Sequence, residues 1–196
     1  NNEELSHFND CANGIAPKYS ELKIYANHLG LDLSIKENNN FYYHSDSGFI
    51  VFEDNYSHLV ADVAKIGPSY LPGHAHADTL SFELAIFGQR IIVNSGTSVY
   101  GISLERSRQR STAAHSTIEI DGQNSSEVWS GFRVARRAIP FNIEISPHAL
   151  QKNIVSFNAS HDGYKRLKNN PIHKRTWIFN KNEWFIEDEI SGNNND

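Results

Sequence analysis

From residue 41 onward the sequence is a succession of short segments in which apolar and polar residues alternate. A period of two places apolar side chains on one face of a β-strand and polar side chains on the other. Turn-forming Gly, Asn, Asp or Pro residues separate these segments. The segments are FYYHSDSGFIVFEDN, SHLVADVA, LSFELAIFG, RIIVNSG, STIEIDG, FNIEIS, NIVSFNAS, KRTWIFN and EWFIEDEI. So many short strands predict antiparallel sheets, most simply a β-sandwich, with a first hairpin turn near 45–48.

Before these segments, apolar residues recur at steps of three and four, the spacing of one helix face. The repeat consists of Leu22, Tyr25, Ala26 and Leu29. Gly30 follows as a C-terminal stop, because glycine tolerates the left-handed conformation that ends many helices. Pro17 interrupts the pattern, which predicts two short helices rather than one long helix.

The composition of the 196-residue chain is that of a globular protein, with 39% hydrophobic residues and a net charge of −5. No apolar stretch approaches the roughly 18 residues that span a membrane, and the negative charge argues against nucleic-acid binding. The chain has no methionine, so we expect it to be a piece of a longer protein. The polar stretch at 36–40 predicts a linker between a helical segment, 1–35, and a sandwich domain, 36–196.

The stretch GHAHADTLSFEL at 73–84 places two histidines and an aspartate on alternate positions where a strand is predicted to begin. Alternate strand residues share a face and lie about 6.5–7 Å apart, so His74, His76 and Asp78 are expected to point into one space. Two such imidazoles bind one metal ion, or one binds metal while the other handles a proton. The alternative is a turn in which the histidines cap backbone groups.

Two later segments add polar residues at comparable spacings. RIIVNSGTSVYG places Asn94 directly after a predicted strand, with Tyr100 close by, and RSTAAHSTIEIDG places His115 at the mouth of another strand. We expect neighbouring strands to deliver these residues to a common site.

Five motifs follow one another along the chain, which are GHAHADTLSFELAIFG, VNSGTSVYG, RSTAAHST, SSEVWSGFRVARRA and HDGYKRL. By these motifs, which occur in the same order there, the chain resembles the heparinase II/III-like family of polysaccharide lyases. FNDCANGIAPKYSELKIYANHLG likewise resembles the end of that family's helical toroid. The resemblance implies a parent protein with an N-terminal (α/α) toroid and a C-terminal antiparallel supersandwich. This chain would hold the last toroid helices and an incomplete sandwich.

The resemblance also implies roles for individual residues. His74 matches the family's active-site histidine at the sandwich edge that faces the toroid, and Tyr100 falls near a tyrosine that lines the substrate cleft. The family cleaves uronic-acid polysaccharides by β-elimination, and its toroid supplies the remaining catalytic groups. We therefore expect an acidic polysaccharide as partner and no activity from this chain alone. A periplasmic or extracellular location would follow for a true lyase.

By the same resemblance, His76 and His115 match two ligands of a structural zinc. Asn94 stands where the third ligand, usually aspartate, is expected, and a neutral amide is a weaker zinc ligand than a carboxylate. Three alternatives follow: zinc completed by water or Asp78, a more weakly bound cation, or a metal-free hydrogen-bonded cluster.

Other residues are candidates for substrate binding. The basic cluster at 106–111, which includes Arg110, could contact an acidic glycan or lie on a solvated strand edge. Trp129 could stack on a sugar ring or belong to the core. His161 and Tyr164, in HDGY, are expected at a turn that reaches the cleft.

Two other functions compete with a lyase. His76, Asp78 and His115 formally make the two-histidine, one-carboxylate set of a metal oxygenase, although Arg175 is a poor match to the cosubstrate anchor that such enzymes need. A non-catalytic glycan-binding or scaffold domain for surface-polysaccharide assembly is the other alternative, and Asn94 in place of aspartate favours it.

Overall fold

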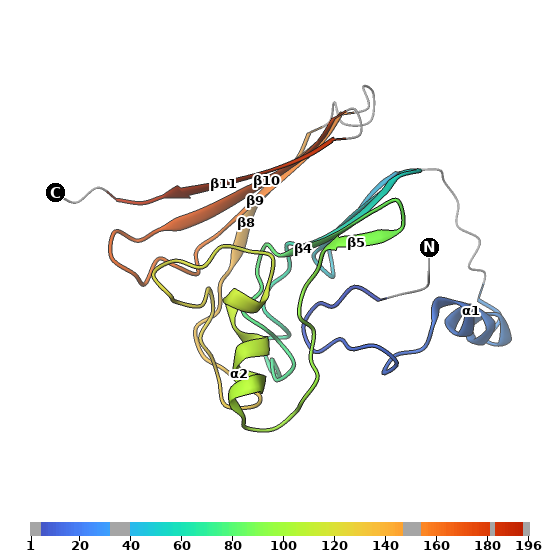
Figure 1. Ribbon diagram of the computed structural model, residues 1–196, viewed down its shortest axis with the longest axis horizontal. Helices are drawn as coiled ribbons and strands as arrows, with labels where there is room; N and C mark the ends of the chain where they lie inside the picture. The colour runs from blue at the N-terminus through green and yellow to red at the C-terminus, as the bar shows by residue number, and fades with distance from the viewer. Residues whose placement is uncertain (1–4, 32–39, 147–153, 181–182, 194–196) are drawn as a thin grey trace.

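The computed structural model describes residues 5–31, 40–146, 154–180 and 183–193. Two antiparallel sheets dominate it (Figure 1). The first sheet has the order β1-β2-β3-β4-β5 and consists of β1 (Phe41–His44), β2 (Phe49–Glu53), β3 (Ser57–Asp62), β4 (Phe82–Ile86) and β5 (Gln89–Ile92). The second has the order β11-β10-β9-β8 and consists of β8 (Pro140–Ile145), β9 (Ile154–His161), β10 (Ile172–Asn180) and β11 (Glu183–Ser191).

The two sheets pack face to face through their apolar sides, which confirms the predicted mainly β, antiparallel sandwich. Buried and half-buried residues alternate along the whole of β10, as the sequence pattern indicates. Trp177 of β10 is fully buried and stacks on Phe157 at 4.8 Å between ring centroids. Across the interface, Phe52 of the first sheet lies 4.6 Å from Phe179 of the second.

The predicted turn of the first hairpin is confirmed. The Gly48 N–H donates to the His44 carbonyl over 2.7 Å, and Gly48 has a φ of 75°. Glycine suits this position because a side chain there would collide with Ala64, whose backbone lies 2.4 Å from the site of a Cβ atom.

One helix, α1 (Tyr19–His28), precedes the sheets, and the predicted stop at Gly30 is confirmed by its φ of 72°. The prediction of a second helix before Pro17 is wrong within the described residues. That segment is an irregular run of turns held against the sandwich instead: the His7 N–H donates to Glu83 and the Thr97 N–H donates to the Cys11 carbonyl, each over 2.9 Å.

In Figure 1, α1 lies apart from both sheets. The residue of α1 that is buried is Ala26. Leu22, Tyr25 and Leu29, which continue the predicted apolar face, are exposed.

The basic cluster at 106–111 is helical, so the prediction of a strand edge is wrong. It forms most of α2 (Leu104–Arg110), followed by the short helix η1 (Thr112–Ala114). The hydroxyl of Ser103 accepts the Arg106 N–H over 3.0 Å and so caps the helix.

The remaining strands are short. The stretch STIEIDG at 116–122 does not form a full strand; its Ile120 makes an isolated β-bridge with Gln123, the residue that follows the stretch. A two-stranded ribbon follows, made of β6 (Val128–Trp129) and β7 (Arg133–Val134).

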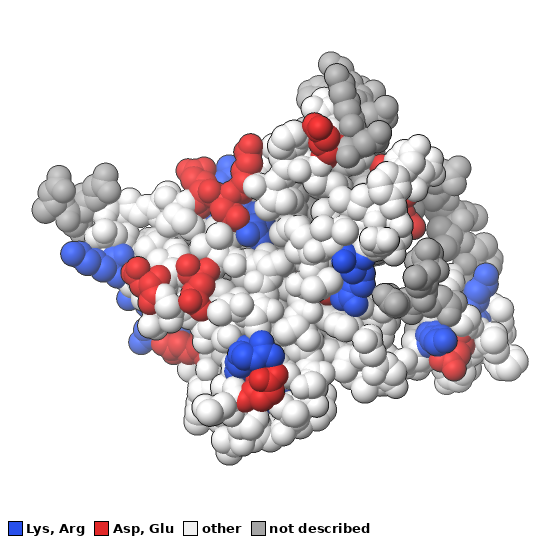
Figure 2. All heavy atoms as spheres, viewed as in Figure 1, with Lys and Arg blue, Asp and Glu red and all other residues white. Residues whose placement is uncertain are grey.

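Within the described ranges, no helix has the length and apolar character needed to cross a membrane. On the face shown in Figure 2, acidic and basic side chains are interspersed with broad uncharged areas.

Candidate functional site

GHAHAD forms an irregular loop before β4, not the beginning of a strand. The side chains at its alternate positions therefore do not lie on one face, which differs from the prediction for a strand. The His74 side chain is 68% exposed, His76 is fully buried, and Asp78 lines a separate hollow with Asp62. His74 and His76 nevertheless meet at one side chain, that of Asp10.

Asp10 is the centre of the cluster. Its Oδ2 accepts a hydrogen bond from His74 Nδ1 and its Oδ1 accepts one from His76 Nε2, both over 2.8 Å. The fully buried guanidinium of Arg106 donates to both oxygens, to Oδ2 over 2.8 Å. Burial opposes ionisation of Asp10, but the hydrogen bonds from His76, Arg106 and His74 outweigh it and hold the pKa of the carboxyl well below its usual range.

A chain of polar contacts continues from Asp10 through two histidines. His76 Nδ1 lies 3.2 Å from His115 Nε2, and His115 Nδ1 lies 3.3 Å from Asn94 Oδ1. Asn94 Oδ1 also accepts the Ser116 N–H over 3.2 Å, so it acts as an acceptor and His115 Nδ1 is the donor. The ionised Asp10 likewise assigns a proton to His76 Nε2.

The consequence is that neutral His76 and His115 turn two unprotonated nitrogens toward each other. Burial lowers the pKa of His76, and burial together with His76 lowers that of His115 to about 3. Two lone pairs 3.2 Å apart repel, and a shared proton or a metal ion relieves this. Asn94 meets His115 at the opposite nitrogen, where it orients the ring.

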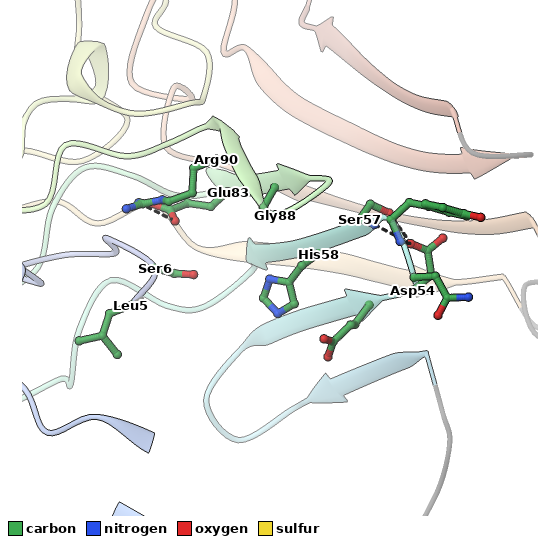
Figure 3. A pocket seen from close by; sticks show the side chains of 12 residues that line it. Leu5, Ser6, Asp54, Ser57, His58, Glu83, Gly88 and Arg90 are labelled. Atoms are coloured by element: carbon green, nitrogen blue, oxygen red, sulfur yellow. Dashed lines mark hydrogen bonds and ion pairs between the residues drawn. The ribbon is translucent and has the colours of Figure 1, made fainter. Parts of the chain in front are cut away.

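Asn94 is anchored through its backbone to a second polar group. The Asn94 N–H donates to Glu83 Oε1 over 3.1 Å, and Arg90 pairs with both Glu83 oxygens at 2.9 Å. Figure 3 shows this ion pair beside Ser6 at a hollow of about 200 Å³, with His58 also on its wall. The amide nitrogen of Asn94 is buried with no partner among the described residues.

The exposed face of His74 adjoins an aromatic cluster. The rings of Tyr100 and Phe132 stack at 5.7 Å between centroids, and the imidazole lies 6.1 and 5.9 Å from them, respectively. Arg106 packs 5.3 Å from the centroid of each of these two rings. Nδ1 of His74 is bonded to Asp10, and no residue in the described ranges hydrogen-bonds to its Nε2.

The other candidate residues lie elsewhere. Arg110 is fully buried, and its guanidinium donates to the backbone carbonyls of Ala75, Trp129, Ser130 and Arg133. It therefore ties the histidine loop to the β6–β7 ribbon. The Trp129 side chain is exposed on that ribbon.

His161 and Tyr164 are fully buried in a separate network. The Gly163 N–H donates to His161 Nδ1, so His161 Nε2 donates to His173 Nδ1 over 3.1 Å, and His173 Nε2 donates to Asp188 over 2.6 Å. Each nitrogen has a complementary partner here, unlike those of His76 and His115. Burial, with the neighbouring His173, lowers the pKa of His161 to about 3.

Three residues of the site, Asp10, Arg106 and Phe132, were not predicted from sequence. Asp10 lies in a segment interpreted as helical, and Arg106 in a cluster interpreted as solvated. Asn9 and Asp10 are turn-forming residues and lie in a turn closed by the Cys11 N–H and the Phe8 carbonyl, but nothing in the local sequence pairs Asp10 with the histidines.

Comparison with known proteins places the chain in a family. A profile described as "Heparinase II/III-like, C-terminal" matches residues 37–196. The chain belongs to the heparinase II/III-like family. It is 28% identical over 152 residues to a heparin-sulfate lyase from Bacteroides stercoris, in a match that covers 74% of this chain and 20% of that protein.

Two solved structures share the fold of this family member. The first is a heparinase III, the BT4657 gene product, with a TM-score of 0.68 and 20% sequence identity. The second is the heparan sulfate lyase HepC from Pedobacter heparinus, with a TM-score of 0.68 and 21% sequence identity. Each match covers 95% of this chain and 29% of the other chain. The chain thus spans less than a third of these structures.

Proposed function

We propose that the whole protein containing this chain is a lyase that cleaves uronic-acid-containing glycans by β-elimination, with His74 in its active site. Membership of a polysaccharide lyase family supports the reaction class. The main observation in support of the role of His74 is the hydrogen bond from its Nδ1 to the ionised Asp10. This bond leaves Nε2 free on an exposed surface beside Tyr100.

The reaction needs a proton acceptor and a stabiliser of negative charge. A base removes the C5 proton, the C5–H electrons form the C4–C5 double bond, the C4–O bond breaks, and the departing oxygen takes a proton from an acid. The His74 Nε2 lone pair can accept the C5 proton, because a positioned imidazole commonly acts as a general base. We propose that Tyr100 acts at the same cleft, as a donor to the reacting sugar.

Substrate binding is proposed for the surface around His74. A hollow of about 370 Å³ adjoins it, lined by Tyr70 and Leu71 among others, and Trp129 is exposed and available to stack on a sugar. Because Arg110 is buried, we propose that it supports the loop and does not touch the glycan.

We propose that His161 and Tyr164, like Arg110, have a supporting role and do not touch the glycan. The Tyr164 hydroxyl donates to the Ile118 carbonyl over 2.5 Å, and both side chains are fully buried. We propose that they support the wall of the cleft from within.

We also propose that His76 and His115 bind a zinc ion, weakly. Their facing nitrogens fit two zinc ligands, and the opposite nitrogens are held by Asp10 and Asn94 as outer partners commonly hold metal-binding histidines. Among the described residues no third His, Cys, Asp or Glu completes the set, whereas zinc sites usually have three or four protein ligands. The zinc would be structural and would pin the loop to the segment after η1.

The positions of these residues also argue against the function of a metal oxygenase. Asp78 lines the hollow that it shares with Asp62 and does not join His76 and His115, and the described part of the chain contains no group of three His, Cys, Asp or Glu residues that could hold a metal ion.

The lyase proposal is tested on the full-length protein. Heparan sulfate, alginate, hyaluronan and bacterial exopolysaccharides are supplied in turn, and the unsaturated product is followed by its ultraviolet absorbance. We expect turnover on at least one polymer and a loss of about 10²-fold or more in kcat/KM for His74→Ala, with His44→Ala, an exposed histidine of β1, unchanged. Binding of a uronate polymer without cleavage would support a glycan-binding protein instead and overturn the proposal.

A further inference from the structure

A pair of buried carboxylates lies outside the histidine cluster. Asp62 ends β3 and is 4% exposed, and Asp78 ends the HAHAD sequence and is 1% exposed. Both line a hollow of about 690 Å³ that extends to the β1–β2 turn and to the segment after β3.

The backbone holds these two residues together. The Leu80 N–H donates to the Asp62 carbonyl over 3.0 Å, and the Ser81 N–H donates to the Asp78 carbonyl over 2.8 Å, so the turn at 78–81 folds Asp78 back toward β3. Leu80 has a φ of 63°, a left-handed conformation that leucine rarely adopts. Such backbone strain persists where the surrounding structure requires it, often at binding sites.

Backbone N–H groups, among them that of Asn9, donate to the pair, but no cationic side chain of the described residues forms an ion pair with it. Asp62 Oδ1 accepts the Ala64 N–H over 2.8 Å, but Asp78 Oδ2 has no hydrogen-bond partner in the described part of the chain. Neither carboxylate belongs to any ion pair found among the described residues, although Lys65, exposed, lines the same hollow.

Both side chains are buried, and a buried carboxylate that no cation accompanies is costly. Two carboxylates that share a hollow must therefore take up either a proton or a cation.

We propose that Asp62 and Asp78 form a binding site for a hard divalent cation, with Ca²⁺ as its preferred occupant. The available ligands are carboxylate oxygens, which Ca²⁺ and Mg²⁺ favour over zinc. Ca²⁺ accepts six to eight oxygen ligands, water included, in flexible geometry, whereas Mg²⁺ demands a near-ideal octahedron, so Ca²⁺ better suits a site in which two protein carboxylates supply part of the ligands. The bound cation would fix the end of β3 against the loop that carries His74 and His76.

The test uses the full-length protein, stripped of metal with a chelator and titrated with CaCl₂ by calorimetry. We expect one Ca²⁺ site that Asp78→Asn and Asp62→Asn each abolish. Asp46→Asn is the matched control, because it removes the same charge from an exposed acid that lines the same hollow. In thermal unfolding, Ca²⁺ at one hundred times its Kd should raise the Tm of the wild type by about 2 °C, but not that of Asp78→Asn.

Without calcium, Asp78→Asn should unfold at or above the wild-type temperature, since it removes the repulsion between the two acids. If that variant fails to fold, Asp62→Asn carries the test. Failure of the wild type to bind Ca²⁺ at millimolar concentration would overturn the proposal in favour of a shared proton, as would equal binding by all variants. Neither readout depends on lyase activity.

Discussion

Asp10 and His76 are joined by a 2.8 Å hydrogen bond between Oδ1 and Nε2, although 66 residues separate them along the chain. The irregular segment before α1 thus supplies the anion at the centre of a cluster whose other members follow β3. His74 bonds to the second oxygen of the same carboxylate. One side chain therefore sets the orientation of both the exposed and the buried imidazole.

Replacement of Asp10 by asparagine is expected to destabilise the protein. The amide keeps the size of the side chain but removes the negative charge that the buried Arg106 requires. A buried charge that loses its partner costs about 3–5 kcal/mol. Urea unfolding should show a loss of about 3 kcal/mol in the free energy of unfolding for Asp10→Asn, against about 0.5 kcal/mol or less for the exposed Asp46→Asn. Equal stability of the two variants would show that the charge of Asp10 does not stabilise the fold.

The buried His161 is expected to make the stability depend on pH. Its folded-state pKa is about 3, whereas an unfolded histidine titrates near 6.5. Between these values the unfolded chain binds a proton that the folded chain does not, so the free energy of unfolding falls as the pH falls, by up to about 1.4 kcal/mol per pH unit. Above about 6.5 this contribution is fully present.

His161→Gln isolates that effect. Glutamine can accept the Gly163 N–H and donate to His173 as the histidine does, but it does not titrate. Urea unfolding between about pH 4 and 7 should give a shallower pH dependence for the variant than for the wild type. Parallel curves would contradict the lowered pKa of His161.

The sequence was sufficient to predict the sheets, because period-two alternation depends on local residues. Trp177 and Phe179 alternate with polar neighbours and are buried as the pattern indicates. The cluster was predicted in part: His76 and His115 do meet. Asp10 and Arg106 were missed because their pairing joins positions 96 residues apart, and a buried arginine has the same local pattern as a solvated one.

The chain alone is predicted to have no lyase activity. It supplies His74 as the base and Tyr100 as a donor, each acid or base typically worth 10²- to 10⁴-fold, but β-elimination also needs groups that neutralise the uronate carboxylate. The chain and the full-length protein should be compared at equal concentration on the polymer that the latter cleaves best. Turnover by the chain that His74→Ala abolishes would contradict this prediction.

A carboxylate at position 94 is expected to strengthen zinc binding. Asn94 Oδ1 accepts a hydrogen bond from His115 Nδ1, and a carboxylate there would make the opposite nitrogen, which faces His76, more basic. It would also remove the amide nitrogen that is buried without a partner in the described structure. Outer-shell partners of this kind change metal affinity by about 10- to 100-fold. The Asn94→Asp variant should therefore bind zinc with an affinity at least about 10-fold higher than that of the wild type, measured in competition with a chromophoric chelator. The double variant Asn94→Asp/His115→Ala should not show this gain in affinity. Unchanged affinity would mean that the facing nitrogens of His76 and His115 share a proton and not a metal ion.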